Sequence, residues 1–210
     1  MSSARIVIPP RGSLPKTYED DPIVYYHRPL LGRLYRARLE LACRLLGPGP
    51  FESLLEVGYG SGILFPELAR RTRRLVGLDV HAREADVAES LRRLGVEAEL
   101  HRGTLYAMPF AEGEFDALTC LSVFEHLTDL DGALDELRRV LHPGGVAVLG
   151  FPVRNPATDA FFRLVGYDPR ELHPSGHKEI LAAVRRHPAF ELEREARLPG
   201  AYVACRARAR

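Results

Sequence analysis

The sequence predicts an α/β fold, with helices covering both faces of a mostly parallel, doubly wound sheet. Segments with the apolar runs of buried strands alternate along the chain with segments of helical periodicity, and repeated strand–helix units build parallel sheets. The length of 210 residues and the hydrophobic content of 46% suit one substantial core. We therefore expect a single domain at residues 30–210, preceded by a proline-rich arm or lid at residues 1–29.

The expected elements follow one another in a regular order. Leucines on one face predict a first helix over 30–46, which the Gly-Pro-Gly-Pro turn after it ends. Strands are expected at 53–57, 74–79, 96–100, 115–121 and 145–151, and helices between them at 62–73, 82–94 and 130–141. The tail predicts a helix at 178–187 and strands near 190–195 and 202–206. The alternating arginines at the end of the chain indicate an edge strand that frays into a solvated tail.

Composition narrows the function classes. A net charge of +1 gives no electrostatic case for nucleic acid as a partner. The three cysteines are widely scattered and show no metal-binding spacing, which suits a reducing cytoplasm. The amino terminus lacks the pattern of a secretion signal, and no apolar stretch is long enough to span a bilayer.

A glycine-rich turn follows the first expected strand. The stretch LLEVGYGSGILF ends an apolar run at Glu56 and then places Gly58, Gly60 and Gly62 at alternate positions. A dinucleotide fingerprint needs glycine where this chain has Ile63, and a phosphate-binding loop needs a lysine that this stretch lacks. Taken alone, the pattern also suits a tight strand-to-helix turn, because glycine serves any turn that requires positive φ.

Turn-forming or polar residues also follow the other expected strands. Asp79 ends the second strand, where a carboxylate can accept both hydroxyls of a ribose. The stretch RGTLYAMPF follows the third strand, and CLSVFEHL ends the fourth. Open α/β sheets bind ligands beyond the carboxyl ends of their strands, so these four strand ends predict one site for a nucleotide-like ligand.

The ordered motifs LLEVGYGSG, VGLDV, GTLYAMPFAEGEFDALTCLSVFEHL and LDELRRVLHPGGVAVLGFP resemble those of class I S-adenosylmethionine-dependent methyltransferases, over roughly residues 51–152. The resemblance implies a Rossmann-like sheet of seven strands with a reversed last strand. It also implies S-adenosylmethionine as cofactor, S-adenosylhomocysteine as product and a small-molecule methyl acceptor. Whether oxygen, nitrogen or carbon receives the methyl group stays open at this stage, as does the oligomeric state.

The resemblance also assigns contacts by position. The glycines, with Glu56 and Tyr59 beside them, would approach the methionine part of the cofactor. Asp79 would hold the ribose, with Val80 beside the adenine. Thr104 and Leu105 fall at the adenine, and Leu121 and Ser122 fall beside the donor methyl.

Two departures from the family pattern bear on the chemistry. The family usually has aspartate where this chain has Thr104, so the bond to the adenine amino group is expected to be weaker or to come from the backbone of Leu105. A metal-binding subgroup carries Glu-x-x-Glu-His after the fourth strand, and Ser122 replaces its first carboxylate, leaving Glu125 and His126. Two ligands seldom hold a metal, so we expect an enzyme that works without one.

Residues for the acceptor are expected in two flanking segments. His173 and His177 fall in a substrate lid at about residues 153–177 and are candidate bases, although SGHKE also suits a helix start. Tyr25, Tyr26 and His27 in the arm would bond the methionine carboxylate of the cofactor or line the acceptor pocket. The alternative is that one tyrosine packs under the first helix while its neighbour faces solvent. Further candidate substrate contacts are Phe124, His126 and Asn155.

Other functions remain open alternatives. A nucleic-acid methyltransferase would usually show an Asn/Asp-Pro-Pro-aromatic motif or a Pro-Cys pair, and neither follows the fourth strand here. A protein-arginine methyltransferase would need a larger acceptor-binding region than this tail. A non-catalytic cofactor-binding or scaffold protein fits less well than an enzyme, because the glycine turn and Asp79 are both present. A dehydrogenase fits least, because Ile63 breaks the fingerprint.

Overall fold

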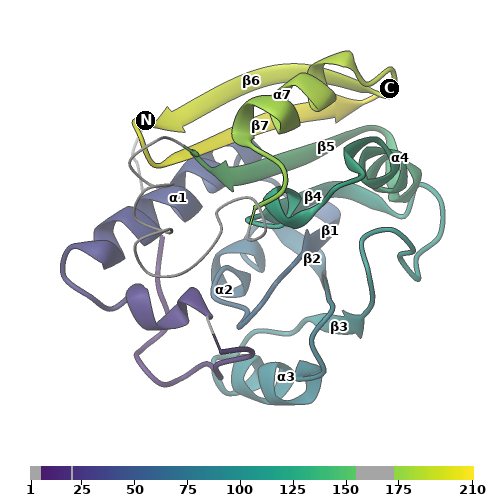
Figure 1. The fold of residues 1–210 in the computed structure, drawn as a ribbon. Helices are drawn as coiled ribbons and strands as arrows, with labels where there is room; N and C mark the ends of the chain where they lie inside the picture. Colours follow the sequence, from purple (N-terminus) through teal and green to yellow (C-terminus); the bar gives the residue numbers. More distant parts are fainter. Residues whose placement is uncertain (1–5, 20, 155–172) are drawn as a thin grey trace.

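The computed structural model describes residues 6–19, 21–154 and 173–210 (Figure 1). Its strands form one seven-stranded sheet in the order β3-β2-β1-β4-β5-β7-β6. The strands are β1 (Phe51–Val57), β2 (Thr72–Asp79), β3 (Glu99–Arg102), β4 (Phe115–Leu121), β5 (Leu141–Pro152), β6 (Phe190–Leu198) and β7 (Tyr202–Ala209). The strand order reverses between β1 and β4, and that reversal creates a switch point where ligands of such sheets bind.

The direction of the strands confirms the expected reversed last strand. The pairs β3–β2, β2–β1, β1–β4 and β4–β5 are parallel, whereas β7 runs antiparallel to both β5 and β6. The expectation of an edge strand at the end of the chain was wrong, because β7 lies between β5 and β6. Cys205, Ala207 and Ala209 are buried in β7, while Arg206 and Arg208 bond Glu193 of β6. The alternation of arginine with small residues therefore marks a half-buried interior strand.

Helices cover both faces of the sheet, and each face has its own core. The helices α4 (Leu130–Val140) and α7 (His177–Arg186) pack against one face, around residues such as Leu118 and Phe151. On the other face lie α1 (Leu31–Leu46), α2 (Phe65–Leu68) and α3 (Glu84–Arg93). No helix among the described residues is both long and apolar enough to cross a membrane.

Two predicted boundaries were wrong because strand pairing overrides local helix propensity. The helix expected over 62–73 is reduced to α2, because β2 begins at Thr72, where it pairs with Phe51 of β1. The third strand is β3 at Glu99–Arg102 rather than 96–100, because Val96 instead packs into the core with α3. Both shifts follow from contacts with distant residues, which a local pattern does not contain.

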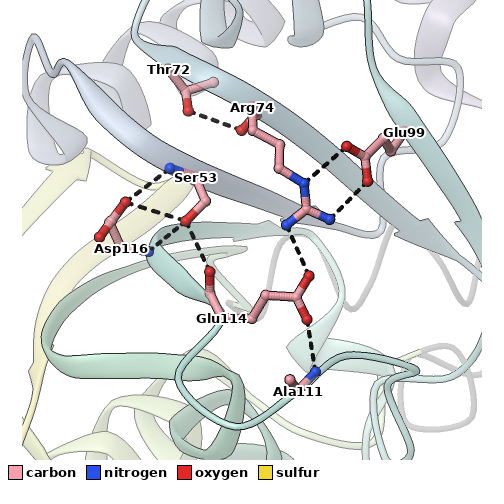
Figure 2. Close-up of polar contacts among 7 residues, drawn as sticks. All are labelled: Ser53, Thr72, Arg74, Glu99, Ala111, Glu114 and Asp116. Carbon is pink, nitrogen blue, oxygen red and sulfur yellow. Dashed lines mark hydrogen bonds and ion pairs between the residues drawn. The ribbon is translucent and has the colours of Figure 1, made fainter.

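Ion pairs and side-chain caps join the four neighbouring strands β3, β2, β1 and β4 at their amino ends (Figure 2). Arg74 donates to both carboxylate oxygens of Glu99 at 2.9 and 2.7 Å and to Glu114 at 2.8 Å. These bonds to Arg74 lower the pKa of Glu99. Asp116 accepts from the backbone N–H of Ser53 at 2.8 Å. The network holds the end of the sheet opposite to the carboxyl ends of the strands.

The arm is packed onto the body of the domain. Its buried carboxylate, Asp21, accepts from the backbone N–H and hydroxyl of Thr17 and from the N–H of Ile23, all at 2.9 Å. Ile6, Leu14 and Tyr26 are buried in the same core as α1. The short helix η1 (Pro22–Tyr25) then leads the chain into α1.

Candidate cofactor and acceptor site

A cavity of about 490 Å³ opens at the carboxyl ends of β1, β2 and β4. Its walls come from the arm, from the turns after β1 and β2, from the segment after β3 and from the residues after β4. They are Tyr18, Val57, Gly58, Leu78, Asp79, Val80, His81, Gly103, Thr104, Leu105, Ser122, Val123, His126 and Leu127. The cavity lies at the switch point of the sheet, where the sequence predicted it.

The glycine turn after β1 needs its glycines for conformation and for space. Gly58, Gly60 and Gly62 have φ of 76°, 52° and 77°, in the left-handed region that side chains disfavour. Gly58 lines the cavity, and a Cβ there would lie 2.3 Å from Cγ2 of Val123. At Gly60 the nearest atom to such a Cβ is the hydroxyl of Tyr18, at 3.9 Å. The backbone at Gly58 is therefore open to the cavity only because no side chain stands there.

Two side chains from the end of β2 hold the middle of this turn. Asp79 accepts from the N–H of Gly60 at 2.8 Å and from the N–H of His81 at 3.2 Å. The ring of His81 lies 2.9 Å from the carbonyl of Gly60 through Nε2, and its Nδ1 accepts from the N–H of Arg83 at 3.1 Å. Because Nδ1 accepts, Nε2 carries the proton and donates to Gly60. The sequence argument identified Asp79 but missed His81.

The wall formed by the end of β2 and the segment after β3 is apolar, with one polar side chain at its edge. Val80 is exposed, Leu105 is buried, and both line the cavity together with Thr104. The hydroxyl of Thr104 accepts from the N–H of Tyr106 at 3.3 Å, within its own turn.

Residues 55–149 match the family model of the methyltransferase domain. The matched stretch is a methyltransferase domain of the class I S-adenosylmethionine-dependent kind. Gly58, Asp79 and Val80, which the resemblance assigned to that cofactor, all line this one cavity.

Curated relatives point to the same family. The chain is 31% identical over 163 residues to the ubiquinone biosynthesis O-methyltransferase of Alkalilimnicola ehrlichii, covering 76% of this chain and 64% of that protein. It is 32% identical over 125 residues to the protein of the same name from Psychrobacter cryohalolentis, covering 55% of this chain and 46% of the relative. The chain thus spans between about half and two thirds of the length of these relatives.

Solved structures share the fold of this chain. The N-methyltransferase NodS from Bradyrhizobium japonicum, in complex with S-adenosylhomocysteine, has a TM-score of 0.66 at 22% identity, over 92% of this chain and 94% of NodS. The cyclase SpnF has a TM-score of 0.69 at 19% identity, over 85% of this chain and 80% of SpnF. At these identities the likeness concerns the fold alone.

Some residues predicted to contact the cofactor do not line the cavity, among them Gly60 and Gly62. Tyr59 is buried, with its ring 5.6 Å from that of Phe65. Glu56 is also buried, which raises the pKa of its carboxyl. Leu121 does not line the cavity either, and it packs instead against the core under α1.

The arm contributes a residue that sequence reasoning missed. Tyr18 lines the cavity, whereas Tyr25, Tyr26 and His27 do not. Tyr26 is buried against Tyr35, with ring centroids 5.3 Å apart, and His27 faces a separate basic cavity with Arg11, Lys16 and Arg28. Thr17, whose bonds to Asp21 brace the turn, directly precedes Tyr18.

Candidate acceptor residues gather after β4 around the short helix η2 (Phe124–His126). His126 lines the cavity, and its ring centroid lies 5.1 Å from that of His173. Ligand atoms of Glu125, His126 and His173 all lie within 4.8 Å of one another, so the structure adds a third residue to the pair noted in the sequence. Phe124, a predicted substrate contact, is instead buried in the core.

The remaining predicted residues are placed as follows. His177 is the first residue of α7 and is 8% exposed, and burial lowers its pKa. It does not line the cavity. Ser175 ties the segment before α7 to the end of η2 by donating to the carbonyl of Leu127 at 2.6 Å. Asn155 and most of the predicted lid, residues 155–172, lie outside the described residues.

Proposed function

We propose that the protein catalyses transfer of a methyl group from S-adenosylmethionine to an oxygen atom of a small molecule. One observation carries the proposal: the open glycine backbone at Gly58 and the carboxylate of Asp79 face one cavity at the switch point of the sheet. The choice of oxygen rests on the relatives, which are named O-methyltransferases of ubiquinone biosynthesis. A cavity of this volume suits a cofactor and a small acceptor better than a macromolecule, so we propose no nucleic-acid partner.

The cofactor, when bound, supplies a methyl group on a sulfonium that is already activated for displacement. The protein then has to bind, align and exclude water. Asp79 is placed to accept from the ribose hydroxyls, and Val80 and Leu105 to flank the adenine. Tyr18 closes the cavity from the arm, over the glycine turn. The end of the cavity at Ser122, Val123 and His126 then remains for the acceptor.

A hydroxyl acceptor must lose a proton, and the pair His126 and His173 is best placed to take it. His126 lines the cavity and His173 stacks edgewise on it. Neither His173 nor His177 lines the cavity, but His173 contacts His126, which does, so His177 is the weaker of the two histidines predicted as bases.

We further propose that the reaction takes place in the cytoplasm and needs no metal, although Glu125, His126 and His173 together offer three ligand atoms within 4.8 Å of one another. Ser122 offers no carboxylate where the metal-binding subgroup has one. Its hydroxyl instead accepts from the cationic guanidinium of Arg38 at 2.8 Å. A reducing compartment is supported by Cys43, Cys120 and Cys205, all of which are free and buried.

The test is incubation of the protein with methyl-labelled S-adenosylmethionine and a panel of phenols and catechols. We expect a labelled methyl ether from at least one compound, together with S-adenosylhomocysteine. An Asp79→Ala variant that remains folded serves as the control and should lose most of the product. Tight binding of S-adenosylhomocysteine with no labelled product from any oxygen or nitrogen acceptor would favour the non-catalytic alternative.

A further inference from the structure

The arm contains a second cavity, of about 620 Å³, which the proposed function does not use. No described residue lines both this cavity and the one at the carboxyl ends of the strands. Its walls come from two stretches of the arm, residues 11–16 and residues 23–29. Between them the chain turns around the buried carboxylate of Asp21, which accepts from Thr17 and Ile23. The cavity is therefore formed within one braced segment of the arm.

The ionisable side chains of this wall are all basic. Among the described residues that line the cavity, Arg11, Lys16 and Arg28 are cations, His27 is the fourth ionisable group, and no carboxylate is present. All four residues are exposed, and none forms an ion pair with a described residue. The guanidinium of Arg28 lies over the ring of Tyr25, 5.6 Å from its centroid. A cleft lined by charge of one sign concentrates ligands of the opposite sign, so this cavity favours an anion.

Hydrogen bonds fix the backbone that carries these cations. Arg11 belongs to a turn in which Ser13 donates to the carbonyl of Pro10, from its N–H at 3.1 Å and from its hydroxyl at 2.7 Å. The carbonyl of Lys16 accepts at 3.1 Å from Nη1 of Arg83, which directly precedes α3. The arm lies beside α3 at this point (Figure 1). A ligand therefore does not have to order this backbone when it binds, which favours affinity.

The rest of the wall is mostly apolar. Leu14 is buried, Ile23 is half-buried, and Val24 is 47% exposed. Pro29 completes this apolar part. Apolar walls with a few charged or polar groups are typical of sites for small molecules. The cavity thus suits a ligand that joins an anionic group to a nonpolar body.

The number of cations indicates which anion fits best. One guanidinium can bond both oxygens of a carboxylate, so three cations exceed what a carboxylate requires. A phosphate monoester carries about two negative charges at neutral pH and offers more acceptor oxygens. Arginine is also the side chain best suited to phosphate, because its planar guanidinium donates in two parallel bonds.

We propose that the cavity binds a small phosphate monoester, with Arg11, Lys16 and Arg28 around the phosphate and Ile23 and Val24 against the nonpolar part. This site is separate from the cofactor cavity and does not depend on the proposed function. The headgroup of a membrane lipid presents the same phosphate chemistry as a soluble compound. The volume of the cavity suits the soluble compound, and the experiment distinguishes the two sources.

The experiment is calorimetric titration of the protein with phenyl phosphate at low ionic strength. We expect saturable binding at a single site, tighter than the binding of inorganic phosphate or of benzoate. Arg28→Gln should weaken it about tenfold or more, because hydrogen bonds between charged groups are lost. Val24→Ser should reduce the preference for phenyl phosphate over inorganic phosphate. Arg33→Gln is the matched control, an exposed arginine of α1 outside the wall, and should leave the affinity unchanged.

The contrary results are equally specific. The proposal is overturned if phenyl phosphate shows no saturable binding, or if Arg33→Gln weakens it as much as Arg28→Gln, because surface charge alone would then attract the anion. Competition between phenyl phosphate and S-adenosylhomocysteine would place the probe in the cofactor cavity and overturn it too. Should Arg28→Gln not fold, Arg11→Gln takes its place.

Vesicles of phosphatidylglycerol and of phosphatidylcholine test the lipid source. Sedimentation of the protein with the anionic vesicles alone, lost in Arg28→Gln and without binding of phenyl phosphate, would assign the cations to a membrane surface and overturn the proposal. Binding of phenyl phosphate without sedimentation supports it. Failure of S-adenosylhomocysteine to bind would refute the proposed function and leave the titration with phenyl phosphate intact.

Discussion

The glycine turn allows a sharp test, because its first two glycines have similar backbones but different surroundings. Replacing either Gly58 or Gly60 by alanine forces a side chain into positive φ, at 76° and 52°. Only at Gly58 does the new Cβ also meet another atom closely, Cγ2 of Val123 at 2.3 Å. Only Gly58 lines the cavity. Both substitutions therefore carry the cost of a strained backbone, and only Gly58→Ala adds the cost of steric overlap.

The expected magnitudes follow from these two costs. The left-handed backbone costs a residue with a Cβ about 1–2 kcal/mol, so Gly60→Ala should lose that much free energy of unfolding. Overlap in a packed site adds typically about 1–3 kcal/mol, so Gly58→Ala should lose about 2–5 kcal/mol. The Cβ at Gly58 also occupies space in the cavity, so affinity for S-adenosylhomocysteine should fall at least about tenfold, and within about threefold for Gly60→Ala.

Denaturant unfolding and calorimetric titration measure the two quantities. Val123→Ala is the informative second change, because it removes the atom that the new Cβ meets. In the double variant Gly58→Ala/Val123→Ala, part of the lost stability should return relative to the sum of the single variants. Equal losses of stability and affinity at Gly58 and Gly60, or strict additivity with Val123→Ala, would refute the steric reasoning.

Three further predictions concern charge. Asp79→Ala should weaken the binding of S-adenosylhomocysteine about ten- to a hundredfold in calorimetric titration. The control Asp86→Ala removes an exposed ion pair to Arg83 and should leave the affinity unchanged. Unchanged affinity in a folded Asp79 variant would place the ribose elsewhere. Because the pKa of Glu125 is raised from 4.5 to about 8, the folded protein holds this proton more tightly than the unfolded chain. Its contribution to stability is thus complete in acid and lost as the pH rises toward 8, and Glu125→Gln should flatten that fall, by up to about 1.4 kcal/mol per pH unit, in unfolding experiments. Methyl transfer should persist in EDTA. Metal independence would be contradicted if EDTA abolished the activity and magnesium or zinc restored it.

The fold was largely predictable, because its strongest signals are local. Apolar runs mark the parallel strands β1, β2, β4 and β5, whereas β3 is mostly polar and was misplaced. The periodicity of α1, α3, α4 and α7 placed those helices within a few residues of their observed bounds. The interior position of β7 was not predictable from its own residues. An alternation of arginine and small residues suits an edge strand equally well, and only pairing with β5 on one side and β6 on the other decides.

The site was predictable where a strand end carries it. Gly58, Asp79, Thr104 and Ser122 line the cavity because each follows a parallel strand, and those ends meet at one edge of the sheet. Tyr18 could not be found this way, because its position depends on how the arm folds back over the glycine turn. Arg38 gave no signal either, since it is one of four arginines between residues 33 and 44, and packing alone distinguishes it.

The charges differ between the two ends of the cavity. At one end Asp79 provides a carboxylate, which accepts from the N–H of Gly60. At the other end the guanidinium of Arg38 donates to the hydroxyl of Ser122 at 2.8 Å. The position at which the metal-binding subgroup carries a carboxylate therefore holds, in this chain, a serine bonded to a cation. A cation beside this position opposes the binding of a divalent cation there, which supports the proposal that the reaction needs no metal.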